Sequence, residues 1–338
     1  MDQIAFFWGY TVVYGSSLII ALSAAAGICF FWAFYVGKGN GVYGAAAAVP
    51  LSVMLSVVLA RLIHWYCRAD SYPGFQKAMT DYSTGGYALA GAFFGCFLTA
   101  VLLRLLGVSK SIPRMLDCMS LAGSAAIGLG RLSCFFNASD RGGILAGNVG
   151  LPLAYPVVNP VSGAAEQRLA VFLFQAVAAG AIFLAVSGMF LRKRETEKLR
   201  DGDVALLVLL FYGAAQVVLD STRYDALYLR SNGFVSLVQL LSAATVVTAV
   251  VVISLRLVRA GGFRLRYVFA WTGIALMLGG AGYMEYYVQR HGDRSLFAYG
   301  VMSACMAGTL IVTMILWIRT TRREQILRLP TVYERKPD

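Results

Sequence analysis

Long apolar runs separated by short polar connections are the main pattern of the chain. Nine runs of about 18 or more apolar residues follow one another. They cover approximately 12–36, 43–66, 85–107, 115–136, 168–191, 203–220, 234–255, 267–288 and 297–318. Backbone polar groups in lipid must pair within the protein, and no alternating pattern of barrel strands occurs. The pattern therefore predicts an all-α polytopic membrane protein with about nine transmembrane helices.

The composition supports a membrane protein and excludes a soluble one. Apolar residues make up 59% of the chain and charged residues 14%, against about 25% charged in soluble domains. The six cysteines occur singly, which predicts neither a disulfide framework nor a metal site, and no cofactor is expected. The net charge of +12 lies in the connections between runs, so it indicates anionic lipid and membrane orientation rather than nucleic acid.

The distribution of basic residues predicts the orientation. If the N-terminus lies outside, 18 Lys and Arg fall in cytoplasmic segments and 8 in outer ones. This bias favours an outer N-terminus and a cytoplasmic C-terminus, which requires an odd number of crossings. The residues from 319 to 338 would then form a short basic cytoplasmic tail.

The predicted orientation also gives the depth of each residue in the membrane, because successive helices cross it in opposite directions. Five helices bring their strongly polar groups to the outer interface. These groups are Tyr14, Arg61, His64, Gly85-Gly86, the segment from Arg131 to Asn137, Gln216, Asp220 and Arg223. A transporter would instead place ionisable groups near the midplane, so this pattern disfavours one.

Arg131 is the most informative of these residues because it lies before the polar loop, inside an apolar run. Its guanidinium could bind a lipid phosphate through two parallel donors, or it could pair with Asp220. Arg61 and Arg223 could bind lipid or extend to the headgroups, and Arg223 could form a local ion pair with Asp220. Gly91 and Gly95 form a small-xxx-small pattern typical of close helix packing.

A family resemblance rests on the segment Gly130-Arg131-Leu132-Ser133-Cys134-Phe135-Phe136-Asn137, followed by Gly142. This segment resembles the Gly-Arg-x-Gly-Asn/Cys-Phe signature of the bacterial prolipoprotein diacylglyceryl transferases. Further matching pieces occur in order over residues 10 to 250. They are Tyr14-Gly15, Ala60-Arg61-Leu62, Gly85-Gly86 with Gly91, Asp117, and Tyr212-Gly213 with Asp220 and Arg223.

The resemblance implies an enzyme of the bacterial cytoplasmic membrane that acts in lipoprotein biosynthesis. Such an enzyme transfers the diacylglyceryl group of phosphatidylglycerol to the lipobox cysteine of a lipoprotein precursor, so an anionic phospholipid and a precursor peptide are the expected partners. The catalytic candidates are Arg131, Tyr14, Asp220 and His64. The lipid-binding candidates are Arg61, Arg131, Asn137, Gly142 and Arg223. The resemblance divides the chain into a seven-helix domain (1–260), an added two-helix segment (261–318) and the tail (319–338).

The chain departs from the family at several positions. Ala90 stands where the family has a histidine, and Gln216 stands where it has an arginine. The expected acidic residue after the signature is replaced by Ser139, unless Asp140 takes its place. His64 could supply the missing base, or it could be an interfacial histidine without that role. The chain is thus either a diverged transferase or a pseudoenzyme, a non-catalytic protein that binds phospholipid or a partner.

Overall fold

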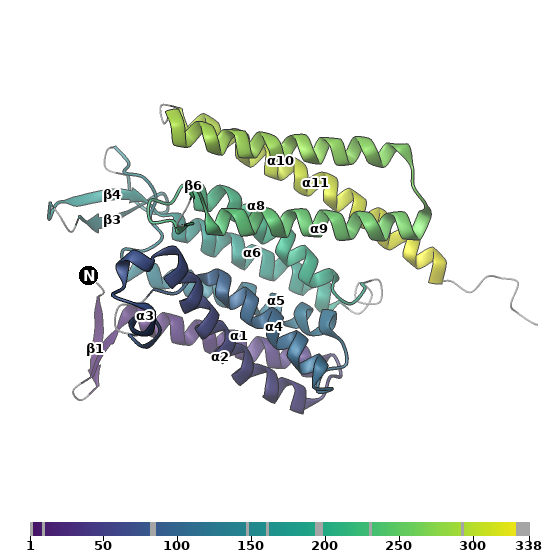
Figure 1. Ribbon diagram of the computed structural model, residues 1–338, viewed down its shortest axis with the longest axis horizontal. Coiled ribbons are helices and arrows are strands. Elements are labelled where there is room, and N and C mark those ends of the chain that lie inside the picture. The colour runs from purple at the N-terminus through teal and green to yellow at the C-terminus, as the bar shows by residue number, and fades with distance from the viewer. Residues whose placement is uncertain are drawn as a thin grey trace, which may run out of the picture.

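The computed structural model describes residues 3–8, 11–81, 86–146, 149–159, 162–192, 199–229, 232–291 and 294–328. Its long helices form one bundle (Figure 1). They are α1 (Gly15–Gly37), α2 (Val42–Cys67), α4 (Leu89–Leu105), α5 (Ile112–Arg131), α6 (Val171–Leu191), α8 (Asp203–Ser221), α9 (Leu237–Gly261), α10 (Leu265–His291) and α11 (Ser295–Arg328). The short helices are α3 (Phe75–Thr80), η1 (Ala69–Ser71) and η2 (Leu132–Phe135).

The predicted all-α membrane architecture is confirmed. In the described residues, eight helices are long and apolar enough to cross a membrane. The remaining predicted span, 85–107, corresponds to α4, which has only 17 residues. The last helix is longer than predicted, because α11 continues from the expected end at 318 to Arg328. The first ten residues of the expected tail are therefore helical, and residues 329–338 lie outside the described part.

Three small antiparallel hairpins were not predicted. They are β1 (Ile4–Trp8) with β2 (Thr11–Tyr14), β3 (Ala154–Val158) with β4 (Ala165–Leu169), and β5 (Tyr228–Leu229) with β6 (Asn232–Ser236). Their strands are short, and β2 and β4 take residues that the apolar runs assigned to the starts of helices. Strands β1, β3, β4 and β6 lie at one end of the bundle, which we call the hairpin end (Figure 1).

The first described strand and the end of the last described helix lie at opposite ends of the bundle. Strand β1 is at the hairpin end, and α11 finishes at the opposite end (Figure 1). An odd number of crossings requires this arrangement. The assignment of the hairpin end to the outer face stays a prediction from the basic residues.

Helix α5 occupies the centre of the bundle. It packs against α1, α4, α6 and α8, and its Met115, Cys118 and Leu121 are fully buried. Helices α10 and α11 pack against each other, and α11 also packs on α8 and α9. The two last helices are thus attached to the side of the bundle formed by α8 and α9.

Asp117 connects α5 to the start of α8. Its two carboxylate oxygens accept hydrogen bonds from the backbone N–H groups of Gly202 (2.7 Å) and Ala205 (2.8 Å). These N–H groups have no partner within the helix, so the two carboxylate oxygens of Asp117 cap its first turn. Asp117 therefore fixes where α8 begins relative to α5.

We expect Asp117→Asn to lower the free energy of unfolding by about 1–2 kcal/mol, because the amide keeps one acceptor oxygen and presents a donor to the second N–H group. Thermal unfolding of the detergent-purified protein measures the change. Asp201→Asn is the matched control, since Asp201 forms a half-exposed ion pair with Arg114 and its loss costs little. Equal effects of the two substitutions would contradict the capping role.

Candidate functional site

Arg131 lies at the end of α5, where the α-helix gives way to the tighter helix η2. Its Nη1 donates to the Oδ2 of Asp140, nine residues further on, and the side chains are 14% and 8% exposed. The other carboxylate oxygen of Asp140 accepts from the Nη2 of Arg223 at 2.7 Å. Asp140 therefore bridges two arginines, one at the end of α5 and one just after the end of α8.

Arg223 contacts two further carboxylates. Its Nη1 lies 3.0 Å from Asp220 Oδ1, and its Nε lies 3.1 Å from Asp225 Oδ1. The second oxygen of Asp220 accepts a hydrogen bond from the hydroxyl of Ser236, which precedes α9. We call Arg131, Asp140, Asp220, Arg223 and Asp225 the arginine–aspartate cluster. It joins the ends of α5 and α8 and the start of α9.

The backbone of Asp140 is also held in place. Its N–H donates to Asp225 (3.0 Å), its carbonyl accepts from the N–H of Phe172 (3.1 Å), and its φ of 55° lies in the left-handed region. Aspartate tolerates this region better than most residues. Burial would raise the pKa of the Asp140 carboxyl, but the charges of Arg131 and Arg223 outweigh it and hold the pKa below its usual range. Asp140 is thus a fixed, ionised counter-ion.

Buried polar atoms continue along α8 from the cluster towards the interior. Tyr212, Gln216 and Asp220 follow at intervals of four residues and share one face of the helix. The Nε2 of Gln175 donates to the Oε1 of Gln216 at 3.0 Å. The Tyr212 hydroxyl lies beside the Arg131 guanidinium, whereas the Nε2 of Gln216 and the Oε1 of Gln175 have no hydrogen-bond partner within the described residues. A polar group entering here would satisfy atoms that are costly to leave unpaired.

Arg141 shapes the loop that carries Asp140. Its guanidinium lies 4.3 Å from the ring centre of Phe172 and 4.7 Å from that of Tyr155. Its Nη2 donates to the backbone carbonyls of Cys134 (2.5 Å) and Asn137 (2.9 Å). Arg141 is fully buried, and its Nε and Nη1 have no hydrogen-bond partner within the described residues.

Asn137 and Gly142 lie near the cluster because hydrogen bonds with the backbone hold their segment in place. The side chain of Asn137 accepts from the N–H of Ser139 at 3.0 Å, which turns the chain towards Asp140. Gly142 pairs with Arg223 in an isolated antiparallel bridge. A Cβ at Gly142 would lie 2.9 Å from the carbonyl oxygen of Thr222, so only glycine allows this approach.

Arg61 and His64 contact a different segment of the chain. Arg61 is 1% exposed, and it donates to the carbonyls of Ala78 (2.5 Å), Gly86 (3.0 Å) and Asp81. The Nδ1 of His64 lies 3.0 Å from the Tyr72 hydroxyl. These two residues organise the connection between α2 and α4. Gly85, the first residue of the expected glycine pair, lies outside the described residues.

Tyr14 is the last residue of β2 and precedes the first turn of α1. It is 40% exposed. The adjacent Gly15 packs against the ring of Phe136, because a Cβ there would lie 2.5 Å from that ring. Tyr14 thus lies near the turn after Arg131.

The structure adds three residues to the site. The sequence left Asp140 open and did not single out Asp225 or Ser236. Asp140 takes the acidic position, since it contacts Arg131 whereas Ser139 is exposed. Asp225 and Ser236 complete the cluster, and neither was a candidate. The closeness of Asp225 to Arg223 in the sequence was the one available signal for it. Ser236 gave none, because it reaches Asp220 from across a hairpin.

The comparison with known families agrees with this geometry. A family model described as prolipoprotein diacylglyceryl transferase matches residues 3–255. This chain belongs to that family. The resemblance found in the sequence is therefore confirmed, and the chain is a multi-pass member of a transferase family of lipoprotein biosynthesis. No curated protein matches the chain. The family match ends before α10 and α11, so these helices lie beyond it.

Proposed function

We propose that this protein transfers the diacylglyceryl group of phosphatidylglycerol to the thiol of a lipobox cysteine, at the outer face of the plasma membrane. The observation that carries the proposal is the family match together with the position of Arg131 in a buried polar cluster at the hairpin end. The unpaired amide atoms of Gln175 and Gln216 support an interior that accepts a polar headgroup.

Arg131 can bind a phosphate without releasing Asp140. The described hydrogen bond to Asp140 uses Nη1 alone, and a guanidinium has five N–H donors in a fork that matches phosphate oxygens. Asp140 therefore orients the guanidinium, Tyr212 contacts it as well, and further N–H donors remain for the ligand. Arg223 balances the second oxygen of Asp140 during binding.

In the proposed reaction the cysteine sulfur forms a bond to the terminal glycerol carbon of the diacylglyceryl group. The bond between that carbon and the phosphate oxygen breaks, and glycerol phosphate leaves with the electron pair. Arg131 stabilises the charge of this leaving group. The thiol proton passes to a carboxylate of the cluster, because the described residues of the site offer no imidazole.

A second candidate function is a non-catalytic protein that binds phospholipid on the same fold. It is favoured by the lack of an imidazole among the described residues of the cluster. The chain has only two histidines. His64 contacts Tyr72, and His291 at the end of α10 stacks on Tyr287. Loss of a general base typically lowers the rate by about 10²–10⁴.

A transfer assay separates the two functions. Purified protein is mixed with vesicles of phosphatidylglycerol labelled in an acyl chain and with a peptide that carries a lipobox cysteine. Labelled peptide and equimolar glycerol phosphate support the transferase, and the same peptide with serine in place of cysteine is the control. Bound labelled lipid without either product would overturn catalysis and support the binding protein.

We expect His64→Ala to retain transfer activity within about threefold of the unchanged protein, because His64 contacts Tyr72 rather than the cluster. The initial rate of peptide labelling measures this. A loss of about 10² or more would instead identify His64 as the general base. Tyr72→Phe removes the same contact and leaves the imidazole in place, so it separates a packing effect from a chemical one.

A further inference from the structure

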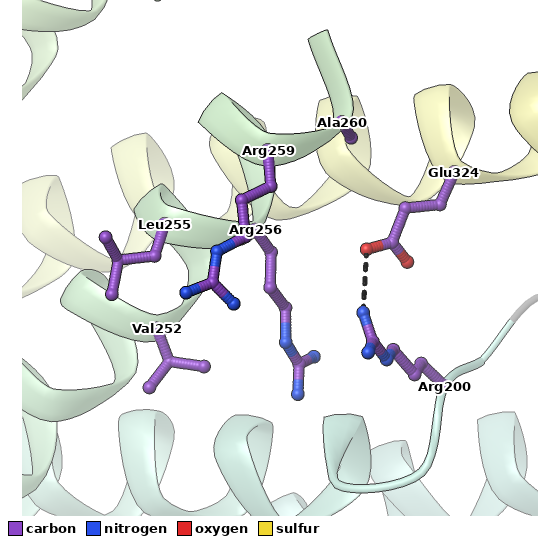
Figure 2. Close-up of a pocket in the computed structure, with 7 residues that line it drawn as sticks. All are labelled: Arg200, Val252, Leu255, Arg256, Arg259, Ala260 and Glu324. Atoms are coloured by element: carbon purple, nitrogen blue, oxygen red, sulfur yellow. Dashed lines mark hydrogen bonds and ion pairs between the residues drawn. The ribbon is translucent and has the colours of Figure 1, made fainter. Parts of the chain in front are cut away.

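A second basic site lies at the opposite end of the bundle, next to the two helices that the family match does not cover. It is a pocket of about 530 Å³, lined by Arg200, Val252, Leu255, Arg256, Arg259, Ala260 and Glu324 (Figure 2). Most of its wall comes from the last turns of α9, and Glu324 comes from α11. The pocket volume lies in the range of small-molecule sites, roughly 300–1,000 Å³.

This pocket is distinct from the arginine–aspartate cluster. Helix α9 connects the two, since Ser236 before its first turn contacts Asp220 and Arg259 lies in its last turn. At 1.5 Å per residue the separation along the helix is about 35 Å, close to the full thickness of the bilayer core. The two sites therefore face opposite leaflets, and basic residues predict the cytoplasmic one for the pocket.

The three arginines of the pocket have only two carboxylate partners among the described residues, so the pocket carries a net positive charge. Arg256 pairs with Asp203, and Arg200 pairs with Glu324 at 3.3 Å. The guanidinium groups of Arg259, Arg256 and Arg200 follow one another across the pocket (Figure 2). Arg259 has no carboxylate partner among the residues described. It lies three residues from Arg256 on the same helical face, where like charges repel unless an anion lies between them.

The pair between Arg200 and Glu324 is easily exchanged for another anion. The Arg200 side chain is 53% exposed and that of Glu324 is 19% exposed. Ion pairs of such exposure contribute about 0–1 kcal/mol. A phosphate offers more acceptor oxygens and more charge than a shared carboxylate. It can therefore bind Arg200 in place of Glu324 and bind Arg259 at the same time.

An apolar surface continues from the pocket along α9. Leu255 lines the pocket, and three apolar residues before it on the same face of α9 are exposed on the surface of the bundle. They are Leu240, Val247 and Val251, each 45–49% exposed, with Leu255 at 52%. A ligand with an anionic group at the pocket and an apolar chain along α9 would cover both surfaces. This combination favours a phospholipid over a soluble phosphate.

We propose that this pocket binds the phosphate-bearing headgroup of an anionic phospholipid from the leaflet opposite the candidate site. Arg259 and Arg256 bind the phosphate, Arg200 adds a third cation, and the acyl chains lie against the α9 face that ends at Leu255. Because Glu324 of α11 forms one wall, the added helices complete this site. Lipid binding at this pocket does not require transferase activity.

Photo-crosslinking in vesicles tests the proposal. The full chain is reconstituted in phosphatidylcholine vesicles that contain a small fraction of phosphatidylglycerol with a photoactivatable acyl chain. After irradiation, mass spectrometry of peptides measures crosslinks to residues 247–260. We expect Arg259→Gln to reduce these crosslinks about fivefold. This is the change in binding expected when one arginine near an anionic lipid surface is lost. Arg264→Gln removes an exposed arginine just beyond α9 and is the matched control.

The outcomes distinguish a specific lipid site from general surface attraction and from a soluble anion. Loss of crosslinks in Arg259→Gln but not in Arg264→Gln, and few crosslinks with a photoactivatable phosphatidylcholine, support the proposal. Equal loss in both variants would show general surface attraction and overturn it. Displacement of the crosslinked lipid by millimolar glycerol phosphate would assign the pocket to a soluble anion and overturn the lipid assignment. Since Arg259 is exposed, Arg259→Gln is expected to fold, and Arg259→Lys tests whether the planar fork matters.

Discussion

Arg131→Gln is expected to reduce diacylglyceryl transfer at least about 10²-fold and to destabilise the protein as well. The activity falls because the phosphate loses a charged, two-donor partner and the leaving group loses its counter-charge. The stability falls because Asp140 is buried and keeps only Arg223 as a charged partner. We expect about 2–3 kcal/mol, below the 3–5 kcal/mol of a wholly uncompensated buried charge.

A double substitution separates these two effects. Arg131→Gln with Asp140→Asn removes both charges of the pair, so the stability is expected to return to within about 1 kcal/mol of the unchanged protein. Transfer activity is expected to stay low, because Arg131 rather than Asp140 binds the phosphate. Unfolding midpoints in detergent and initial rates of peptide labelling measure the two quantities on the same samples.

If the double variant recovered activity together with stability, this would contradict the role of Arg131 in binding the phosphate. Arg131 would then serve only as the counter-ion of Asp140. Arg290→Gln provides the matched control, since Arg290 is exposed at the hairpin end of α10 and its loss changes the charge on the same side of the membrane. It is expected to change neither rate nor stability by more than experimental error.

The helices could be predicted because each apolar run reports directly on a membrane crossing. All nine runs contain a helix within the described residues, although α4 is shorter than its run. The hairpins could not be predicted, because their strands have at most five residues. Such strands are set by their partners rather than by a periodic pattern of their own.

The candidate site was predicted in part, for a similar reason. Sequence position gives the depth of a residue in the membrane, but it does not give the side of the bundle on which the residue lies. Arg61 and Arg131 were placed at one level, yet Arg61 binds the α2–α4 connection and Arg131 binds Asp140. The local pair of Asp220 with Arg223 was one of the alternatives and is present, because a spacing of three residues fixes both depth and side.

Gly91→Ala is expected to produce the largest loss of stability among single substitutions outside the cluster. The small-xxx-small pattern of Gly91 and Gly95 predicted close helix packing, and α4 indeed packs on α2 at both residues. A Cβ on Gly91 would lie 2.1 Å from the backbone nitrogen of Ala60, and one on Gly95 would lie 2.5 Å from that of Ser56. These atoms belong to a helix backbone, so the two helices must separate to admit a methyl group.

Separation of α2 and α4 would also break the hydrogen bond from Ala88 to Ala60 (3.1 Å) and disturb the carbonyls that Arg61 binds. We therefore expect a loss of about 3 kcal/mol in unfolding free energy, the upper part of the range for overpacking. Gly188→Ala in α6 is the control, because its Cβ would meet no atom within 4 Å. There the helical preference of alanine over glycine should stabilise by up to about 1 kcal/mol. Opposite signs for the two substitutions in thermal unfolding would establish the packing role of Gly91, and a shared sign would refute it.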